Sequence, residues 1–351
     1  MKIKPAAYFL ALVFSFPLFA RDSTDTIVMK NGDRLTGEIK GLDGGVLYVS
    51  MPYILATSSI DWSKVARLES KQLFIVKTAS GSVYRGALKT NDTEADRPVK
   101  IEILETPNKE VAIDSQQIVN MAQTSNRFWQ RFNGAVNFGT TYTKGNETVQ
   151  YTVGSEVEYL RERWSAGANW NSTLSRSSGS SAATRNELTL SGRHLLPWNN
   201  YFYAGLADFL QSSVQGIPLQ TTIGAGIGRY LQNTNRATIS ILGGLAWQST
   251  QYNQAKVTAP TEQLAAALIG SDVKLFKFNK TNLEVTALLF PVLNTPGRVK
   301  FSLNSTYYIK ITGDLSWNVS FYGNWDNRPP ASFAASDYGT SSGLSWTFGM
   351  K

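Results

Sequence analysis

Apolar and polar residues alternate along almost the whole chain after residue 131. The runs FNGAVNFGTTY (132–142) and WSAGANW (164–170) illustrate the pattern. Successive side chains of a β-strand point to opposite faces, so each run has one apolar and one polar face. The runs are about 11 to 14 residues long, whereas ordinary strands have about 5 to 6 residues and strands of about 9 to 11 cross a bilayer. The pattern therefore predicts membrane-crossing strands.

We expect twelve such strands, and an even number is usual for single-chain bacterial barrels. They cover residues 131–143, 147–160, 162–175, 184–195, 199–211, 218–231, 235–248, 263–277, 281–293, 297–309, 313–325 and 338–349. Three connections at one end are long, namely 176–183, 249–262 and 326–337, and those at the other end are short. Long outer loops and short inner turns are typical of outer-membrane barrels.

Aromatic residues concentrate at the ends of the apolar faces. Such girdles mark the two membrane–water interfaces of transmembrane barrels. The candidate interface aromatics are Phe132, Tyr142, Tyr151, Tyr159, Trp164, Trp170, Trp247, Trp317, Trp325, Trp346 and Phe348.

The polar face consists largely of Gly, Ser, Thr and Asn, which suits a wet lumen and would make a poor protein core. Alternation places nine charged residues on this face, and they are the candidate lumen-lining residues: Glu156, Glu158, Glu187, Arg193, Asp208, Asp272, Lys274, Glu284 and Lys300. An acidic excess in an open pore favours cations. The alternative is that these groups pair across neighbouring strands, with Asp272 and Lys274 beside Glu284 and Glu284 beside Lys300. Twelve strands lie between the filled eight-stranded barrel and the wide porins, so strand number does not decide.

The first 20 residues have the layout of a secretory signal peptide. Lys2 and Lys4 precede an apolar stretch from Ala6 to Phe19, and the small residue Ala20 ends it. This stretch is short for a membrane-spanning helix, which needs about 20 residues. We therefore expect an exported protein.

Residues 21–125 contain a tandem repeat of a small β unit. The copies begin TIVMKNGDRLTGEI and LFIVKTASGSVYRGAL, and each later contains an Ile-Asp pair, at residues 60–61 and 113–114. An Asn-Gly turn between alternating apolar residues is a strong hairpin signal. The pattern resembles the small barrels of the SH3/Sm type. Each copy is small for a stable core, so we expect the two to pack together.

Composition excludes several kinds of chemistry. With no Cys and a single His, we expect no thiolate or His-based metal site, no cofactor and no enzyme activity. Sm-like barrels often bind RNA, but export and the absence of a basic-aromatic cluster argue against a nucleic-acid partner. Asp61, Trp62 and Asp114 we interpret as strand-end carboxylates and a packing Trp.

The chain also resembles a known family, the salt-induced outer-membrane proteins grouped as domain of unknown function 481. The resemblance covers roughly residues 129–348, from FNGAVNFGTTYTKGNETVQYTVGSEVEY to GTSSGLSWTFGM. The upstream NGDRLTGEI and IDWSKVARL segments are similar to the leader domain that accompanies such barrels. The resemblance implies a barrel in the outer membrane of a Gram-negative bacterium and no particular activity.

The predicted fold class is therefore all-β: a twelve-stranded antiparallel transmembrane β-barrel (126–351) after a small periplasmic β domain (21–125). The expected partners are outer-membrane lipid, the barrel-assembly machinery and a periplasmic protein bound by residues 21–125. Three functions stay open: a narrow passive pore for ions or small polar solutes, a non-conducting interaction protein, and a lipid hydrolase. The hydrolase is the least supported, because the parity of His194 places it towards lipid.

Overall fold

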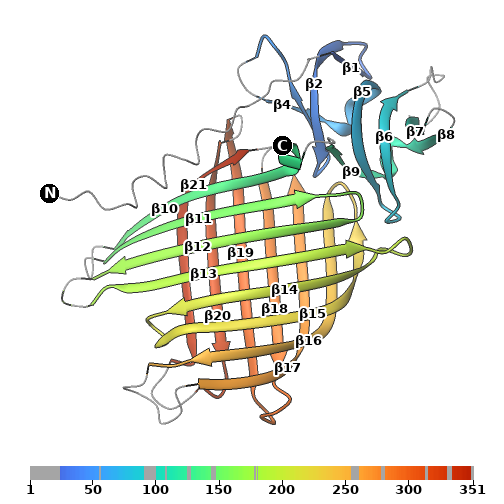
Figure 1. The fold of residues 1–351 in the computed structure, drawn as a ribbon. Helices are drawn as coiled ribbons and strands as arrows, with labels where there is room; N and C mark the ends of the chain where they lie inside the picture. Colours follow the sequence, from blue (N-terminus) through green and yellow to red (C-terminus); the bar gives the residue numbers. More distant parts are fainter. Residues whose placement is uncertain are drawn as a thin grey trace.

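The structure is a computed structural model that describes residues 24–54, 57–90, 100–106, 109–124, 128–143, 148–177, 179, 181–253, 261–277, 281–312, 315–329 and 334–348. The predicted signal peptide lies outside these residues. The described chain is almost entirely β, with a smaller N-terminal domain beside a barrel (Figure 1). None of its helical segments has the length and hydrophobicity to cross a membrane.

The N-terminal domain contains the segments that the sequence predicts to form two repeats. Its elements are β1 (Asp25–Met29), β2 (Arg34–Asp43), β3 (Val46–Ser50), β4 (Ser58–Asp61), η1 (Trp62–Lys64), β5 (Val65–Thr78), β6 (Val83–Lys89), β7 (Lys100–Thr106), β8 (Lys109–Asp114), η2 (Ser115–Gln117) and β9 (Ile118–Gln123). The long β5 belongs to both repeats: its first half pairs with β1 and its second half with β6 and β9. Resemblance to the SH3/Sm type stays a prediction.

One hydrophobic core joins the two repeats. It includes Ile27 and Leu47 from the first and Ile101 and Ile118 from the second. Trp62 is 6% exposed, and its indole N–H donates to the Ser115 carbonyl 2.8 Å away, across the repeat boundary. Packing of one unit against the other compensates for the small size of each.

Among the described residues, twelve strands form a closed antiparallel barrel. They are β10 (Phe132–Thr143), β11 (Thr148–Leu160), β12 (Trp164–Arg176), β13 (Ala183–Leu195), β14 (Tyr201–Ser212), β15 (Ile217–Asn233), β16 (Ala237–Gln251), β17 (Thr261–Lys277), β18 (Thr281–Pro291), β19 (Val299–Thr312), β20 (Leu315–Asp326) and β21 (Ser336–Phe348); the short η3 (Phe128–Arg131) precedes them. Every predicted strand is present, with ends within three residues of those expected. Pairing of β10 with β21 closes the barrel, as in Val136 opposite Trp346.

The outer face of the barrel is apolar and carries the predicted interface aromatics. Exposed among them are Tyr151, Trp164, Trp170, Trp247, Trp317, Trp325 and Trp346. The ring centroids of Phe132 and Tyr159 lie 5.0 Å apart with the rings tilted by 57°, and the ring centroid of Trp164 lies 5.5 Å from that of Tyr159. The side chains of Tyr142 and Phe348 lie outside those described.

Trp170 lies in the middle of β12 rather than at its end, and the reason is on the neighbouring strands. Beyond it, the outer face carries a polar ladder in which Ser172 donates to Asn186 and Asn186 donates to Gln211, both at 2.7 Å. The outer face of β12 is therefore mixed beyond Trp170, with the polar Ser172 followed by Leu174.

This apolar belt leads to a first prediction. Leu245 is 66% exposed on the outer face of β16. Leu245→Arg should cost about 2–4 kcal/mol of folding free energy in lipid, as expected for a cation in the hydrocarbon. Ser249 lies on the same face of β16, two residues beyond Trp247 and nearer the loop end. Ser249→Arg should therefore cost less than about 1 kcal/mol. Reversible urea unfolding in phospholipid vesicles measures both; equal costs would contradict the belt.

The inner face differs from the sequence expectation on one side. We expected few large apolar residues there, but β14 and β17 direct Phe202, Leu210, Leu264 and Leu268 inward, all of them buried. Glycines of β15 make room for this packing. A Cβ on Gly224 would lie 3.2 Å from Leu268 Cδ2, and one on Gly228 would collide with the Phe202 ring. The expectation was wrong here because alternation shows which side chains point inward but not whether they contact water. These inward side chains pack against one another.

The two ends of the barrel differ. The connections at one end have four to nine residues and those at the other have two to five; we call these the loop end and the turn end. The N-terminal domain lies at the turn end (Figure 1).

Candidate functional site

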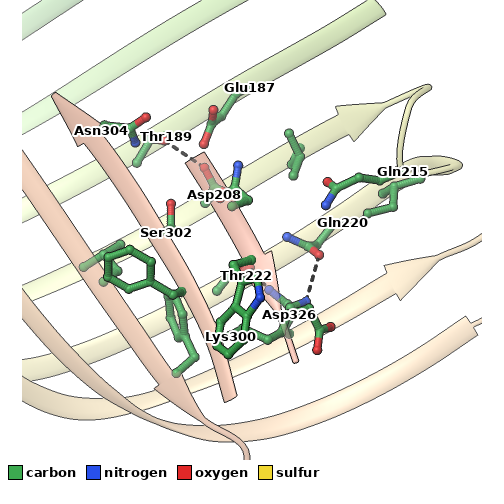
Figure 2. Close-up of a pocket in the computed structure, with 18 of the residues that line it drawn as sticks. Glu187, Thr189, Asp208, Gln215, Gln220, Thr222, Lys300, Ser302, Asn304 and Asp326 are labelled. Atoms are coloured by element: carbon green, nitrogen blue, oxygen red, sulfur yellow. Dashed lines mark hydrogen bonds between the residues drawn. The ribbon is translucent and has the colours of Figure 1, made fainter. Parts of the chain in front are cut away.

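Inside the loop end of the barrel lies a cavity, the loop-end cavity, with about 170 Å³ of free volume. Side chains from β13 to β16 and from β18 to β20 line it. Figure 2 shows Glu187, Asp208, Gln220 and Lys300 directed into it from four strands. Lys300 donates to the amide oxygens of Gln220 and Gln248, on the opposite wall.

A second cavity, the turn-end cavity, lies between the barrel and the N-terminal domain. It has about 180 Å³ of free volume. The barrel contributes Glu156, Glu158, Lys274 and Glu284, and the N-terminal domain contributes Asp43, Gly44, Val46 and Tyr48.

A group of side chains that we call the cross-lumen bridge (Arg193, Tyr230, Asp272 and Thr286) separates the cavities. Arg193 of β13 donates to Asp272 of β17 at 2.8 Å and to the Tyr230 hydroxyl at 2.7 Å. Thr286 of β18 donates to the other Asp272 oxygen at 3.0 Å. Thr286 also lines the loop-end cavity, and Glu284, the next inward residue of β18, lines the turn-end cavity. The bridge therefore crosses the lumen between the two.

The N-terminal domain contacts the turn end at points spread around the mouth of the barrel. Asn200 donates to the Ala79 carbonyl and Asn235 to the Ile118 carbonyl, both at 2.8 Å. On the other side, Lys310 of β19 donates to the Ser59 hydroxyl at 2.8 Å and lies 5.3 Å from the centre of the Tyr48 ring. Contacts with strand ends so far apart mean that the domain covers the mouth.

Lys77 links the electrostatics of the two parts. Burial lowers the pKa of this lysine below its ordinary value; the carboxylate of Glu158 opposes the shift and the cation of Arg193 adds to it. Both of those charges belong to the barrel. The protonated form of Lys77 is therefore less favourable at the covered mouth than in water.

The structure places all nine predicted lumen residues on the inner face: three in the loop-end cavity (Glu187, Asp208 and Lys300), four in the turn-end cavity and two in the bridge. The predicted neighbour pairing holds for Lys274 and Glu284, whose charged atoms are 3.5 Å apart. It is wrong for Asp272, which pairs with Arg193, and for Lys300. Glu284 lies opposite Thr306 and Lys300 opposite Phe290, so antiparallel register puts Lys300 at the other end of the lumen from Glu284.

Sequence reasoning missed Arg185, which is buried and bonds both Glu187 at 2.9 Å and Asp337, across the lumen, at 2.8 Å. Arg185 lies two residues before Glu187 on the same strand, so alternation alone already places its side chain on the lumen face. Asp337 was missed because the predicted last strand begins one residue later, at residue 338, whereas β21 begins at Ser336.

Three further residues that stood out in the sequence, Asp61, Asp114 and His194, lie outside the lumen. Asp61 and Asp114 cap the short helices η1 and η2 by accepting from the backbone N–H of Ser63 and Gln116. His194 is exposed on the outer face, opposite Trp164 and Tyr203. Over the described residues, no group of three or more His, Asp or Glu is placed to hold a metal ion.

The sequence model of the family described as "Protein of unknown function, DUF481" matches residues 136–348. The chain belongs to this family. The match covers almost the whole DUF481 barrel and confirms the resemblance seen in the sequence. No curated protein matches the chain.

Several solved outer-membrane barrels are similar to this DUF481 protein. The translocator domain of autotransporter NalP from Neisseria meningitidis is 16% identical, with 62% of this chain and 87% of that chain covered and a TM-score of 0.32. A porin is 9% identical, with 62% and 99% covered and a TM-score of 0.28. A Pseudomonas aeruginosa FadL homologue is 9% identical, with 80% and 88% covered and a TM-score of 0.27. These similarities do not define the number of strands, which follows from the strand pairing of the DUF481 barrel itself.

Proposed function

We propose that this protein is an outer-membrane channel for a small solute and is closed at rest. The observation that carries the proposal is the pair of cavities in one lumen, separated by the cross-lumen bridge. A barrel filled throughout by its own side chains would not contain two such cavities, and a wide pore would not contain side chains that bond across its lumen. Opening requires the Arg193–Asp272 contact to break.

In this proposal the short turns and the N-terminal domain face the periplasm, because long loops of outer-membrane barrels face the medium. The domain covers the turn end at rest and moves away when the channel opens. The hydrogen bonds that hold the domain there join polar side chains to backbone carbonyls and a hydroxyl, and such bonds can exchange with water when the domain leaves.

Planar-bilayer recording of the full mature chain tests this function. We expect brief openings of low conductance separated by long closed periods. A permanently open pore would contradict closure at rest, and silence at all voltages would contradict conduction.

A second candidate is a non-conducting envelope protein whose N-terminal domain binds another component. The observation in its favour is the covered mouth. It predicts silence even when the bridge is removed, so the recordings described in the Discussion separate the two functions.

A further inference from the structure

The loop-end cavity holds a carboxylate that makes no direct ion pair among the described residues. Three carboxylates line it, those of Glu187, Asp208 and Asp326. Glu187 pairs with Arg185 at 2.9 Å and Asp326 with Arg298 at 2.7 Å. Asp208 accepts a hydrogen bond from the Thr189 hydroxyl at 2.8 Å, and no cation among the described residues pairs with it. A carboxylate accepts more than one hydrogen bond, so Asp208 has capacity left for a donor.

Lys300, the cation that lines this cavity, does not neutralise Asp208. Its ammonium donates to two neutral amide oxygens, those of Gln220 and Gln248. Figure 2 shows the contact with Gln220 and, apart from it, the contact of Asp208 with Thr189.

Apolar as well as polar side chains surround Asp208 in this cavity. Leu206 and Leu210 flank it on the inner face of β14, and Leu288 and Phe290 of β18 line the same cavity. An engineered cavity of about 150 Å³ holds benzene, so the 170 Å³ here accommodates a molecule of about that size. Apolar walls with a few placed polar groups are typical of small-molecule sites.

We propose that the loop-end cavity binds a small organic cation, a protonated amine with an apolar body. The ammonium donates to the Asp208 carboxylate, and the apolar body packs against Leu206, Leu210, Leu288 and Phe290. A hydrogen bond to a charged group contributes about 1.5–3 kcal/mol, which corresponds to about tenfold or more in affinity. If the proposed channel function holds, such a cation is also the solute that passes; the binding site itself does not depend on it.

Isothermal titration of the full mature chain in detergent, with benzylamine as the probe, tests the site. Benzylamine is protonated at neutral pH. We expect it to bind, and Asp208→Asn to raise its Kd about tenfold. Benzyl alcohol has the same shape without the charge and should bind about tenfold more weakly than benzylamine. Glu156→Gln, which removes a lumen carboxylate of the turn-end cavity, is the matched control and should leave the Kd unchanged.

Two outcomes overturn the inference: equal Kd values for the Asp208→Asn variant and the wild type, or equal binding of benzyl alcohol and benzylamine. Leu206→Trp, which fills the cavity, should abolish binding of both compounds, and retained binding would place the ligand elsewhere. Gel migration before and after heating checks that each variant is folded. Flux of benzylamine into proteoliposomes is measured separately, because binding without flux supports this site and contradicts the channel, whereas flux unchanged by Asp208→Asn contradicts the site alone.

Discussion

Arg193→Ala should raise the open probability of the channel in planar bilayers at least about tenfold. Arg193 reaches across the lumen to Asp272, bonds Tyr230 on the way, and lies 4.4 Å from the centre of the Phe202 ring. Truncation to Ala removes both hydrogen bonds and leaves Asp272 with the hydrogen bond from Thr286. Breaking a charge-assisted contact worth about 1.5–3 kcal/mol shifts a two-state equilibrium about tenfold or more.

The matched control for this experiment is Arg229→Ala. Arg229 lies on the outer face of β15, against the Tyr201 ring and the Asn199 carbonyl, so its loss leaves the lumen intact. Unchanged recordings for Arg193→Ala would show that the bridge does not close the lumen. Equal increases for both variants would point to a general loosening of the barrel.

Trp62→Ala should destabilise the N-terminal domain by about 3–5 kcal/mol, the range for truncating a large buried aromatic side chain. Trp62 packs in the core shared by the two repeats and donates to the Ser115 carbonyl, so the substitution leaves both a cavity and an unpaired acceptor. Amide hydrogen exchange of β5 and β9 in the full chain measures the loss. Tyr53→Ala in the same domain is the control, because Tyr53 is 69% exposed, and it should change the free energy by less than about 0.5 kcal/mol.

The same variant connects stability to function. A domain that opens more often should cover the turn end less, so Trp62→Ala should also lengthen channel openings. Loss of protection in β5 and β9 without a change in the recordings would separate the domain from closure of the lumen.

Much of this fold could be predicted from the sequence because lipid leaves a chain few choices. A strand that crosses a bilayer must bury its apolar face in lipid and satisfy its backbone in a closed sheet. Alternation in runs such as 132–142 therefore fixed strand positions to within three residues. The N-terminal repeat was visible for a similar reason, since each copy needs the same turn and the same capped Ile-Asp segment.

The site was less predictable, because it depends on contacts across the lumen. Arg193 and Asp272 are 79 positions apart and four strands apart around the barrel. Parity places both inside, but their relative height depends on the tilt and stagger of the strands. Alternation could not reveal the inward packing of Phe202 on Gly228 either, because a Gly and a Phe on the lumen face become partners only once the barrel is closed.

We propose that the N-terminal domain covers the turn end and must leave it for conduction. A Cβ on Gly45 would lie 3.5 Å from the Cβ of Asn235, within the range of a disulfide, and the chain has no other Cys. We would record Gly45→Cys/Asn235→Cys in the Arg193→Ala background, with Gly45→Cys alone as the control. We expect the oxidised protein to be silent, reductant to restore its openings, and the control not to respond. Equal conductance of the cross-linked and reduced forms would contradict it.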